Sequence, residues 1–203
     1  MIKAILFDLD GVLVDAVKLH EKAFLEAVRP HKEISEEYHM QNLNGLPTKK
    51  KLEKLGFYKD LIEEINAKKQ EITFQLIPKH IKPIPEVLAV IEEVKNREIP
   101  FCVCSNSIRK STELLVEHAG VSGAVFLLSN QEVINHKPSP EMYLKAMERL
   151  GLTKEDVLIV EDSPVGLEAA RATGAKVCQI ANPYDIEKVL KTLDELEKEI
   201  IQK

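Results

Sequence analysis

The sequence predicts an α/β fold: a Rossmann-like, doubly wound parallel sheet whose chain is interrupted by an inserted α-helical cap. The first observation is a set of five short runs that are continuously apolar rather than alternating, at 3–8, 100–105, 124–129, 157–161 and 175–180. Such runs indicate strands that are buried on both faces of a sheet. The second observation is that helix-period stretches separate the later runs, and strands that alternate with helices are typical of a parallel sheet.

The predicted core helices have recognisable ends. They lie at 85–97, 108–119, 139–150 and 164–173. Pro85 and Pro140 fall near first turns, where a missing backbone N–H costs no hydrogen bond. Gly120, Gly151 and Gly174 fall where helices are expected to stop. A further amphipathic and heavily charged stretch, at 185–200, is expected to be a solvated surface helix.

A long interval without a strand divides the chain into two predicted domains. Between residues 15 and 82 there are four helix-like stretches, at 16–29, 34–43, 48–55 and 59–77. We therefore predict an α/β core domain formed by residues 1–14 and 83–203, and a helical cap domain formed by residues 15–82. The boundaries are placed at the turn LVDAV and at the segment from Pro78 to Pro85, which holds three prolines.

Composition excludes several classes of protein. The 203 residues carry 28 Lys and Arg against 33 Asp and Glu, and the resulting net charge of −5 argues against a general nucleic-acid binder. A hydrophobic fraction of 44% argues against disorder. No stretch approaches the roughly 20 apolar residues that a membrane helix needs. The acidic residues up to Asp15 exclude a secretory signal peptide.

Cysteine usage fits a cytoplasmic protein. Cys102 and Cys104 are two positions apart in a predicted strand, which separates their side chains too far for a good disulfide. The total of three cysteines leaves one thiol over. We expect buried apolar residues rather than a redox or metal site, a cytoplasmic location and a monomer.

Polar residues follow several of the predicted strands, at the point where each strand ends. In open parallel sheets, ligands bind outside the carboxyl ends of the strands. The residues concerned are Asp8, Asp10 and Gly11, then Ser105 and Asn106, then Glu161, Asp162 and Ser163, with Lys137 in the loop NHKPSP. Because these positions meet at one edge of the sheet, the sequence predicts a single site there.

The carboxylates of this site suit phosphoryl transfer. Asp8, Asp10, Glu161 and Asp162 need a counter-cation, and hard oxygen ligands favour Mg²⁺ bound together with a substrate phosphate. One of the first two carboxylates can attack phosphorus to form an acyl phosphate. The other can protonate the leaving oxygen and later activate water.

The remaining groups can hold the phosphoryl group. Lys137 supplies positive charge against the nucleophile and the transferring group. Ser105, Asn106 and the backbone N–H groups at the following helix start can bind phosphate oxygens. Positioning and charge neutralisation do most of the catalysis in this class of reaction.

Four motifs in this chain resemble those of the haloacid dehalogenase superfamily of phosphohydrolases. They are FDLDGVLVD at 7–15, CSN at 104–106, HKPSPEMY at 136–143 and VEDSPVGLEAA at 160–170. They stand in the family's order and spacing, and with the core strands they cover about 135 residues. The helical insertion at 15–82 resembles the family's cap. The resemblance therefore implies a phosphohydrolase with a cap inserted after the first motif.

The resemblance also implies a role for each matching residue. Asp8 would be the nucleophile and Asp10 the general acid and base. Ser105 or Asn106 would bind phosphate, and Lys137 would balance charge. The implied Mg²⁺ ligands are the Asp8 carboxylate, the Asp10 backbone carbonyl, Asp162 and Glu161, the last of these directly or through water.

Within the superfamily, the chain is similar to the β-phosphoglucomutase-like and sugar-phosphatase branch. His20 matches a histidine that lies near the cap hinge in those proteins and can assist proton handling; a helix-surface histidine is the alternative. The segment LNGLPTKKKL at 43–52 resembles the specificity loop of these proteins, so Thr48 and Lys49 become candidate substrate contacts. Further candidates are Lys69, which resembles a cap lysine that touches the phosphate, Arg109 after the second motif, and Gly11 beside the nucleophile. A solvated helix face is the alternative for Lys69, and an exposed first-turn arginine is the alternative for Arg109.

Two departures from the branch favour a phosphatase over a mutase. The mutases carry an arginine that grips a second phosphate, whereas this chain has Thr48 followed by Lys49–Lys51. Lysine is a point charge and does not replace a bidentate arginine. The motif after Asp15 also differs, with Ala16–Val17 where relatives often have Ser or Thr followed by Glu.

The leading hypothesis is thus a Mg²⁺-dependent phosphatase that acts on a small phosphorylated metabolite, a sugar or polyol phosphate, through an aspartyl phosphate. The runner-up is a β-phosphoglucomutase-type mutase that uses the same Asp8 chemistry. A catalytically inactive scaffold whose cap binds a partner is the alternative of a different class. No nucleic-acid or membrane partner is expected.

Overall fold

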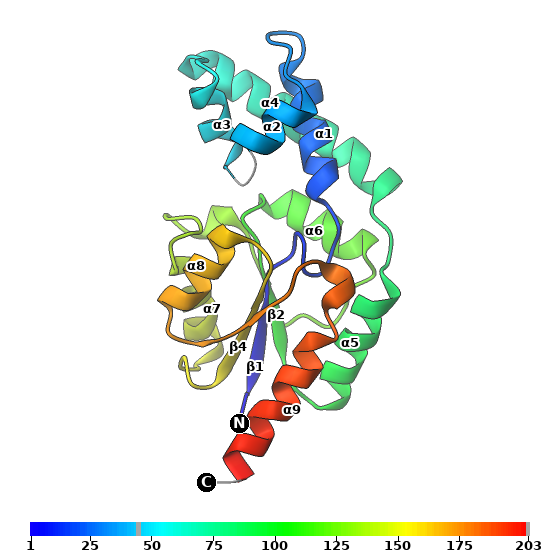
Figure 1. Ribbon diagram of the computed structural model, residues 1–203, viewed down its shortest axis with the longest axis vertical. Coiled ribbons are helices and arrows are strands. Elements are labelled where there is room, and N and C mark those ends of the chain that lie inside the picture. The colour runs from blue at the N-terminus through cyan, green and yellow to red at the C-terminus, as the bar shows by residue number, and fades with distance from the viewer. Residues whose placement is uncertain (44–45, 202–203) are drawn as a thin grey trace. The chain divides into compact units, whose positions relative to one another are not determined.

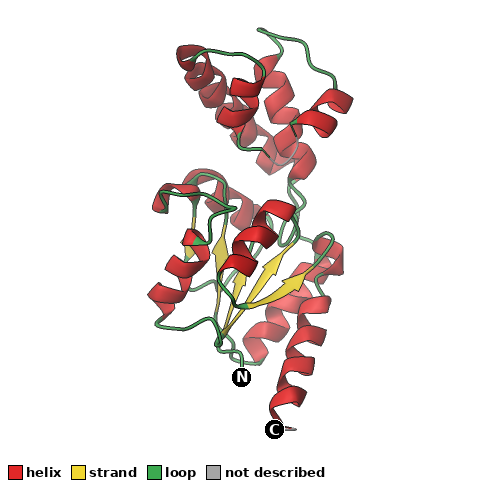
Figure 2. Cartoon of the chain, turned by 60° about the vertical axis from the view of Figure 1, so that its left-hand side comes forward, coloured by secondary structure: helices red, strands yellow, loops and turns green. Residues whose placement is uncertain are grey.

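A computed structural model of the protein describes residues 1–43 and 46–201. Its centre is a five-stranded sheet in the order β3-β2-β1-β4-β5, with every pairing parallel. The strands are β1 (Ala4–Phe7), β2 (Phe101–Cys104), β3 (Leu127–Leu128), β4 (Val157–Glu161) and β5 (Lys176–Gln179). Helices lie on both faces of this sheet (Figures 1 and 2). The predicted doubly wound α/β fold is confirmed.

The three central strands are apolar because helices cover both of their faces. Every residue of β1, β2 and β4 is buried. In the middle of the sheet, Ile5 lies opposite Phe101 on one side and Leu158 on the other. The register aligns the ends of β1 and β4, so the residues that follow Phe7 start beside Glu161.

The prediction that every strand is buried on both faces is wrong for the two edge strands, β3 and β5. The run 124–129 forms a strand of two residues, Leu127–Leu128. In β5, Lys176 and Gln179 are exposed and Cys178 is buried. An edge strand has a neighbour on one side only, and charged side chains on it are a common protection against further pairing.

In the described part of the chain, five α-helices surround the sheet. They are α5 (Pro85–Asn96), α6 (Arg109–His118), α7 (Glu141–Leu150), α8 (Pro164–Ala172) and α9 (Lys188–Ile201). Helices α7 and α8 pack on the face of the sheet that carries Leu6, Cys104 and Ile159. Helices α5 and α9 contact each other (Figure 1), and α9 also contacts β5. The cysteines Cys102, Cys104 and Cys178 are buried free thiols, as expected.

Helix α9 is less solvated than its charge predicts. Val189 and Leu193 are fully buried, and Ile186 just before the helix is buried too. These residues share one face of the helix by their spacing of three and four. The charged residues occupy the opposite face, so the helix is a covering element of the core with a solvated outer face.

Four helices form a separate compact unit. By contacts, the described chain divides into Met1–Asp15 with Lys82–Lys203, here called the core unit, and Ala16–Ile81, here called the helical unit. The helices of the second unit are α1 (Val17–Val28), α2 (Glu36–Asn42), α3 (Thr48–Lys54) and α4 (Lys59–His80). Helix α1 packs along α4. The function of the helical unit as a cap stays a prediction.

Helix α4 does not end at residue 77 as predicted. It continues through Pro78 to His80. A proline inside a helix removes one backbone hydrogen bond and costs about 3 kcal/mol. Leu76 and Ile77 are buried just before the proline, and Ile81 is buried just beyond the end of the helix, so packing on both sides of Pro78 holds the helix together. No helix in the described ranges is long and apolar enough to cross a membrane.

Candidate active site

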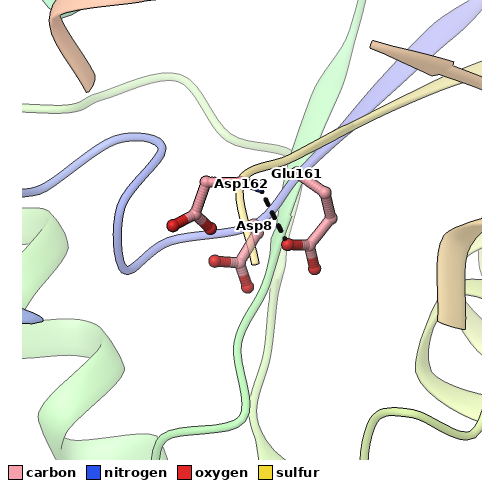
Figure 3. Close-up of side chains that lie close together, drawn as sticks. All are labelled: Asp8, Glu161 and Asp162. Atoms are coloured by element: carbon pink, nitrogen blue, oxygen red, sulfur yellow. Dashed lines mark hydrogen bonds between the residues drawn. The ribbon is translucent and has the colours of Figure 1, made fainter. Parts of the chain in front are cut away.

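The carboxyl ends of β1 and β4 bring three carboxylates together. Asp8 directly follows β1, and its backbone N–H donates to Val160 O at 3.0 Å, which continues the sheet pairing by one residue. Glu161 is the last residue of β4 and Asp162 follows it. The side chains of Asp8, Glu161 and Asp162 gather at this edge (Figure 3), with one carboxylate oxygen from each within 4.8 Å of the others. The structure therefore brings together three of the four predicted acidic side chains in one cluster.

Lys137 is the cation of this cluster. Its Nζ atom donates to Asp8 Oδ1 at 2.6 Å, Glu161 Oε1 at 2.7 Å and the Cys104 carbonyl at 2.9 Å. It also lies 2.8 Å from the hydroxyl of Tyr143. Burial opposes the charged form of Lys137, but the charges of Asp8 and Glu161 outweigh it and raise the pKa of the lysine. Lys137 is therefore held as a permanent buried ammonium.

The cluster carries more negative charge than Lys137 can balance. Burial, with the neighbouring charge of Glu161, raises the pKa of Asp8 well above its ordinary value, although Lys137 acts in the opposite direction. Burial and the same Glu161 charge raise the pKa of Asp162 to about 6. Both pKa values rise for different main reasons: burial is the largest cause for Asp8, whereas the charges of Asp8 and Glu161 outweigh burial for Lys137.

The arrangement fits a hard divalent cation. Asp162 Oδ1 is buried and has no hydrogen-bond partner among the described residues. A buried carboxylate oxygen without a partner is costly, and a cation bound to oxygen ligands removes that cost. Two glycines make room for the ligands: a Cβ atom on Gly11 would collide with Asp162, and one on Gly166 would collide with Glu161. Gly11 also has a φ of +90°, which favours glycine.

Asp10 lies beside the loop that follows strand β2. Its Oδ2 atom accepts a hydrogen bond from the Ser107 hydroxyl at 3.2 Å. The backbone of this turn is fixed by Gly11 N–H, which donates to Val14 O at 2.8 Å. Ser105 is fully buried, and its hydroxyl accepts from the Ser107 N–H at 3.0 Å. Ser107 thus connects the predicted acid–base residue with the predicted phosphate-binding loop.

Asn106 and Arg109 make structural contacts of their own. The Asn106 side chain accepts from the Lys137 N–H at 3.2 Å and donates to the Lys137 carbonyl at 3.4 Å. Both ends of the amide therefore clamp the backbone that carries the lysine. The Arg109 guanidinium donates to Leu127 O at 2.9 Å and pairs with Glu132. Phosphate binding by Asn106 and substrate contact by Arg109 stay predictions.

The predicted cap residues lie within the helical unit. Lys69 is buried, with Nζ 3.3 Å from Nδ1 of His20. Thr48 is the first residue of α3. Lys49 pairs with Glu63 at 2.6 Å on the surface. Within the predicted specificity loop 43–52, residues 44–45 lie outside the described part of the chain. Contact of these side chains with substrate stays a prediction.

Tyr143 and His39 make buried polar contacts that the sequence alone does not predict. Tyr143 is fully buried, and its hydroxyl donates to Glu161 Oε1 at 2.6 Å. In the helical unit, His39 lies between Glu21 at 3.0 Å and Lys51 at 2.9 Å. The helix period of 139–150 could have placed Tyr143 on the buried face. No spacing in the sequence signals the His39 contacts, because three different helices supply them.

Comparisons with known proteins identify the same family. A family model described as haloacid dehalogenase-like hydrolase matches residues 5–180. A curated relative from Thermotoga maritima, named phosphorylated carbohydrates phosphatase, is 30% identical over 178 residues, which cover 85% of this chain and 82% of that protein. The match over most of both chains is independent of the site geometry above.

Solved structures share the fold along the same length. CbbY from Rhodobacter sphaeroides, in complex with phosphate, is 27% identical with a TM-score of 0.79, over 91% of this chain and 88% of that one. A β-phosphoglucomutase from Clostridium difficile has a TM-score of 0.81 at 20% identity over the whole of both chains, and this likeness shows the fold alone. The predicted hydrolase assignment is confirmed: the chain belongs to the haloacid dehalogenase-like hydrolase family.

Proposed function

We propose that the protein is a Mg²⁺-dependent phosphatase that hydrolyses a small phosphorylated metabolite, a sugar or polyol phosphate, through a phosphorylated Asp8. The observation that carries this proposal is the buried Lys137 ammonium held between Asp8 and Glu161, next to the unpartnered oxygen of Asp162. The naming of the Thermotoga relative as a phosphatase of phosphorylated carbohydrates supports the reaction and the substrate class.

Asp8 is the nucleophile in this proposal. Its carboxylate oxygen attacks phosphorus, the bond between phosphorus and the ester oxygen breaks, and the leaving alcohol takes a proton from Asp10. Water then attacks the phosphorus of the acyl phosphate while Asp10 accepts the proton of that water. Phosphate leaves and the Asp8 carboxylate is regenerated. The Ser107 hydroxyl, 3.2 Å from Asp10 Oδ2, supports a fixed position for the acid.

Charge neutralisation comes from the surrounding groups. Lys137 is 2.6 Å from Asp8 and stays close to the phosphoryl group as negative charge builds up on it. Ser105 and the backbone N–H groups at the start of α6 are the proposed phosphate donors. Asp8, Asp162, the Asp10 carbonyl and Glu161, the last directly or through water, would hold Mg²⁺, which would supply further positive charge to the phosphoryl group.

Hydrolysis is favoured over a mutase reaction by the helical unit. A mutase needs a firm grip on a second phosphate, for which a bidentate arginine is suited. At the corresponding point, Lys49 is on the surface and paired with Glu63. Transfer of the phosphate to water needs no such grip.

A substrate screen tests the proposal. Sugar, polyol and nucleotide monophosphates are incubated with the protein, with and without Mg²⁺, and released phosphate is measured. We expect Mg²⁺-dependent release, fastest from a sugar or polyol phosphate, and none above background with Asp8→Asn. Rapid conversion of β-glucose 1-phosphate to glucose 6-phosphate that depends on a bisphosphate activator would instead establish the mutase. A wild-type rate in Asp8→Asn would remove the nucleophile assignment.

A further inference from the structure

Tyr143 closes a triangle of contacts with Lys137 and Glu161 inside the core unit. Its hydroxyl donates to Glu161 Oε1 at 2.6 Å and accepts from Lys137 Nζ at 2.8 Å. Lys137 Nζ also donates to the same Glu161 oxygen at 2.7 Å. All three side chains are buried, so these contacts involve charged groups in a region of low dielectric constant, where they are strong.

The chemistry of the groups fixes the direction of the Tyr143–Glu161 bond. A lysine ammonium has three hydrogens, and four acceptors lie within 2.9 Å of Lys137 Nζ, in Asp8, Cys104, Glu161 and Tyr143, so at least one hydrogen is shared between two of them. The Glu161 carboxylate can only accept, so the single hydroxyl hydrogen of Tyr143 goes to it. Glu161 Oε1 therefore has a second donor besides Lys137. Because Tyr143 also donates to Glu161 Oε1, this oxygen depends less on Lys137 for its hydrogen bonds. The other carboxylate close to the ammonium is that of Asp8.

The two oxygens of Glu161 are held unequally. Oε1 has the short bonds from Tyr143 and Lys137. Oε2 has longer contacts, from the Asp162 N–H at 3.2 Å and the Ser163 hydroxyl at 3.4 Å. The Tyr143 ring also lies beneath the ammonium, with Lys137 Nζ 4.6 Å from the ring centroid. Oε1 is thus held in place by Tyr143 and Lys137, and Oε2 is the oxygen that can bind a cation.

We propose that Tyr143 is a positioning residue whose hydroxyl fixes Glu161 so that its second oxygen faces the divalent cation, while Lys137 stays directed at Asp8. This inference rests on the proposed function, since it takes Glu161 as part of the cation site. Groups that orient a metal ligand by hydrogen bonding typically change metal affinity or activity about 10- to 100-fold when they are removed.

Cation binding without substrate tests the inference. Tyr143→Phe keeps the ring and removes the hydroxyl, and Mn²⁺ serves as the probe in electron paramagnetic resonance titrations of the full chain. We expect the Mn²⁺ dissociation constant to rise about tenfold. The matched control is Tyr184→Phe, which alters an exposed tyrosine and leaves the constant unchanged. Wild-type Mn²⁺ affinity in a Tyr143→Phe protein that melts at the wild-type temperature would overturn the inference.

A second measurement does not depend on the stability of a variant. The chain has four tyrosines, of which Tyr143 is buried and Tyr38, Tyr58 and Tyr184 are exposed. With ¹³Cζ-labelled tyrosine, we expect Mg²⁺ to shift the phenol signal of Tyr143 and to leave the other three in place. An unshifted Tyr143 signal at saturating Mg²⁺ would overturn the inference. Absence of any Mn²⁺ or Mg²⁺ binding by the wild type is a different failure, because it removes the proposed cation site itself.

The kinetic parameters separate positioning from a general packing role. At saturating Mg²⁺ we expect Tyr143→Phe to lower kcat about tenfold while KM changes less than twofold, because in this proposal Lys137 and Asp8 act on the phosphoryl group whereas Tyr143 is fully buried behind them. A rise in KM at unchanged kcat would contradict the assigned role.

Discussion

Lys137 Nζ lies 2.6 Å from Asp8 Oδ1, although 129 positions separate the two residues in the sequence. The contact is buried, and it forms because the ends of β1 and β2 and the loop before α7 meet at one edge of the sheet. The Asn106 side chain holds the backbone of Lys137 at both its N–H and its carbonyl. The position of the ammonium is therefore fixed by the loop after β2 as well as by the carboxylates.

Lys137→Met should destabilise the protein in a pH-dependent way. Removal of one partner from a buried ion pair costs about 3–5 kcal/mol, because the other charge stays buried. The pKa of Asp8 already lies above its unfolded value through burial and Glu161, and loss of the cation raises it further. A carboxyl group with a raised folded pKa stabilises the fold less as pH increases. Urea unfolding should therefore show a larger loss at pH 8 than at pH 5.

The exposed Lys154 provides the control for that experiment, since its pair with Glu155 is long and solvated. Lys154→Met should change the unfolding free energy by less than about 0.5 kcal/mol at either pH. An equal loss for Lys137→Met at pH 5 and pH 8 would contradict the electrostatic account of the cluster.

Gly11→Ala should abolish cation binding, while Gly151→Ala should not. Both glycines have a positive φ, +90° and +66°, so an alanine is strained at each. A Cβ atom at Gly11 would also collide with Asp162, whereas one at Gly151 would meet nothing within 4 Å. Gly151→Ala should therefore lose about 1 kcal/mol of stability and keep wild-type Mg²⁺ affinity. Calorimetric Mg²⁺ titration distinguishes the two, and normal affinity in Gly11→Ala would exclude Asp162 as a ligand.

Mg²⁺ affinity should decrease with acidification through pH 6. Burial and the Glu161 charge raise the pKa of Asp162 to about 6 in the cation-free protein. A proton on this carboxyl group competes with the cation, so the affinity should fall as the pH drops through about 6. Titrations at pH 5, 6 and 7 measure the slope. Equal affinities across that range would show that Asp162 does not bind the ion.

Lys51 should titrate below the ordinary range of a lysine side chain. Burial and the charge of Lys69 lower its pKa to about 8, against the opposing effect of Glu21. In NMR spectra of lysine side chains, one signal should titrate near pH 8 and be missing from Lys51→Arg. Lys69→Met should move that midpoint upward, because a like charge is removed. If the midpoint stays at the wild-type value in Lys69→Met, the two ammonium groups are not neighbours.

Most of the core could be predicted from the sequence because its signals are local. The continuous apolar runs placed β1, β2 and β4 and the acids that follow them, and burial on both faces is what produces such runs. The edge strand β5 was predicted from the run 175–180 in the same way, but it exposes Lys176 and Gln179, because edge position is a property of strand order that the run does not show. Helix α4 passes through Pro78 for a similar reason, since the packing of Ile77 compensates for a local helix-breaking signal.

The sequence predicts those residues of the site that lie within recognised motifs. Asp8, Lys137, Glu161 and Asp162 occupy quoted motifs, and the structure brings them together. The contacts of Asn106 with Lys137 and of Tyr143 with Glu161 join segments that the sequence separates by 31 and 18 positions. Those contacts depend on side-chain directions that no spacing rule supplies. The same holds for the fit of Gly11 and Gly166 against two carboxylates.

The most direct test of the central claim is a rapid-quench experiment with a ³²P-labelled substrate found in the screen. The protein is mixed with substrate and Mg²⁺, denatured in acid within milliseconds, and digested to locate the label. The account predicts an acid-stable, hydroxylamine-sensitive label on the peptide that contains Asp8, and none in Asp8→Asn. Label on a different residue, or full turnover by Asp8→Asn, would contradict it.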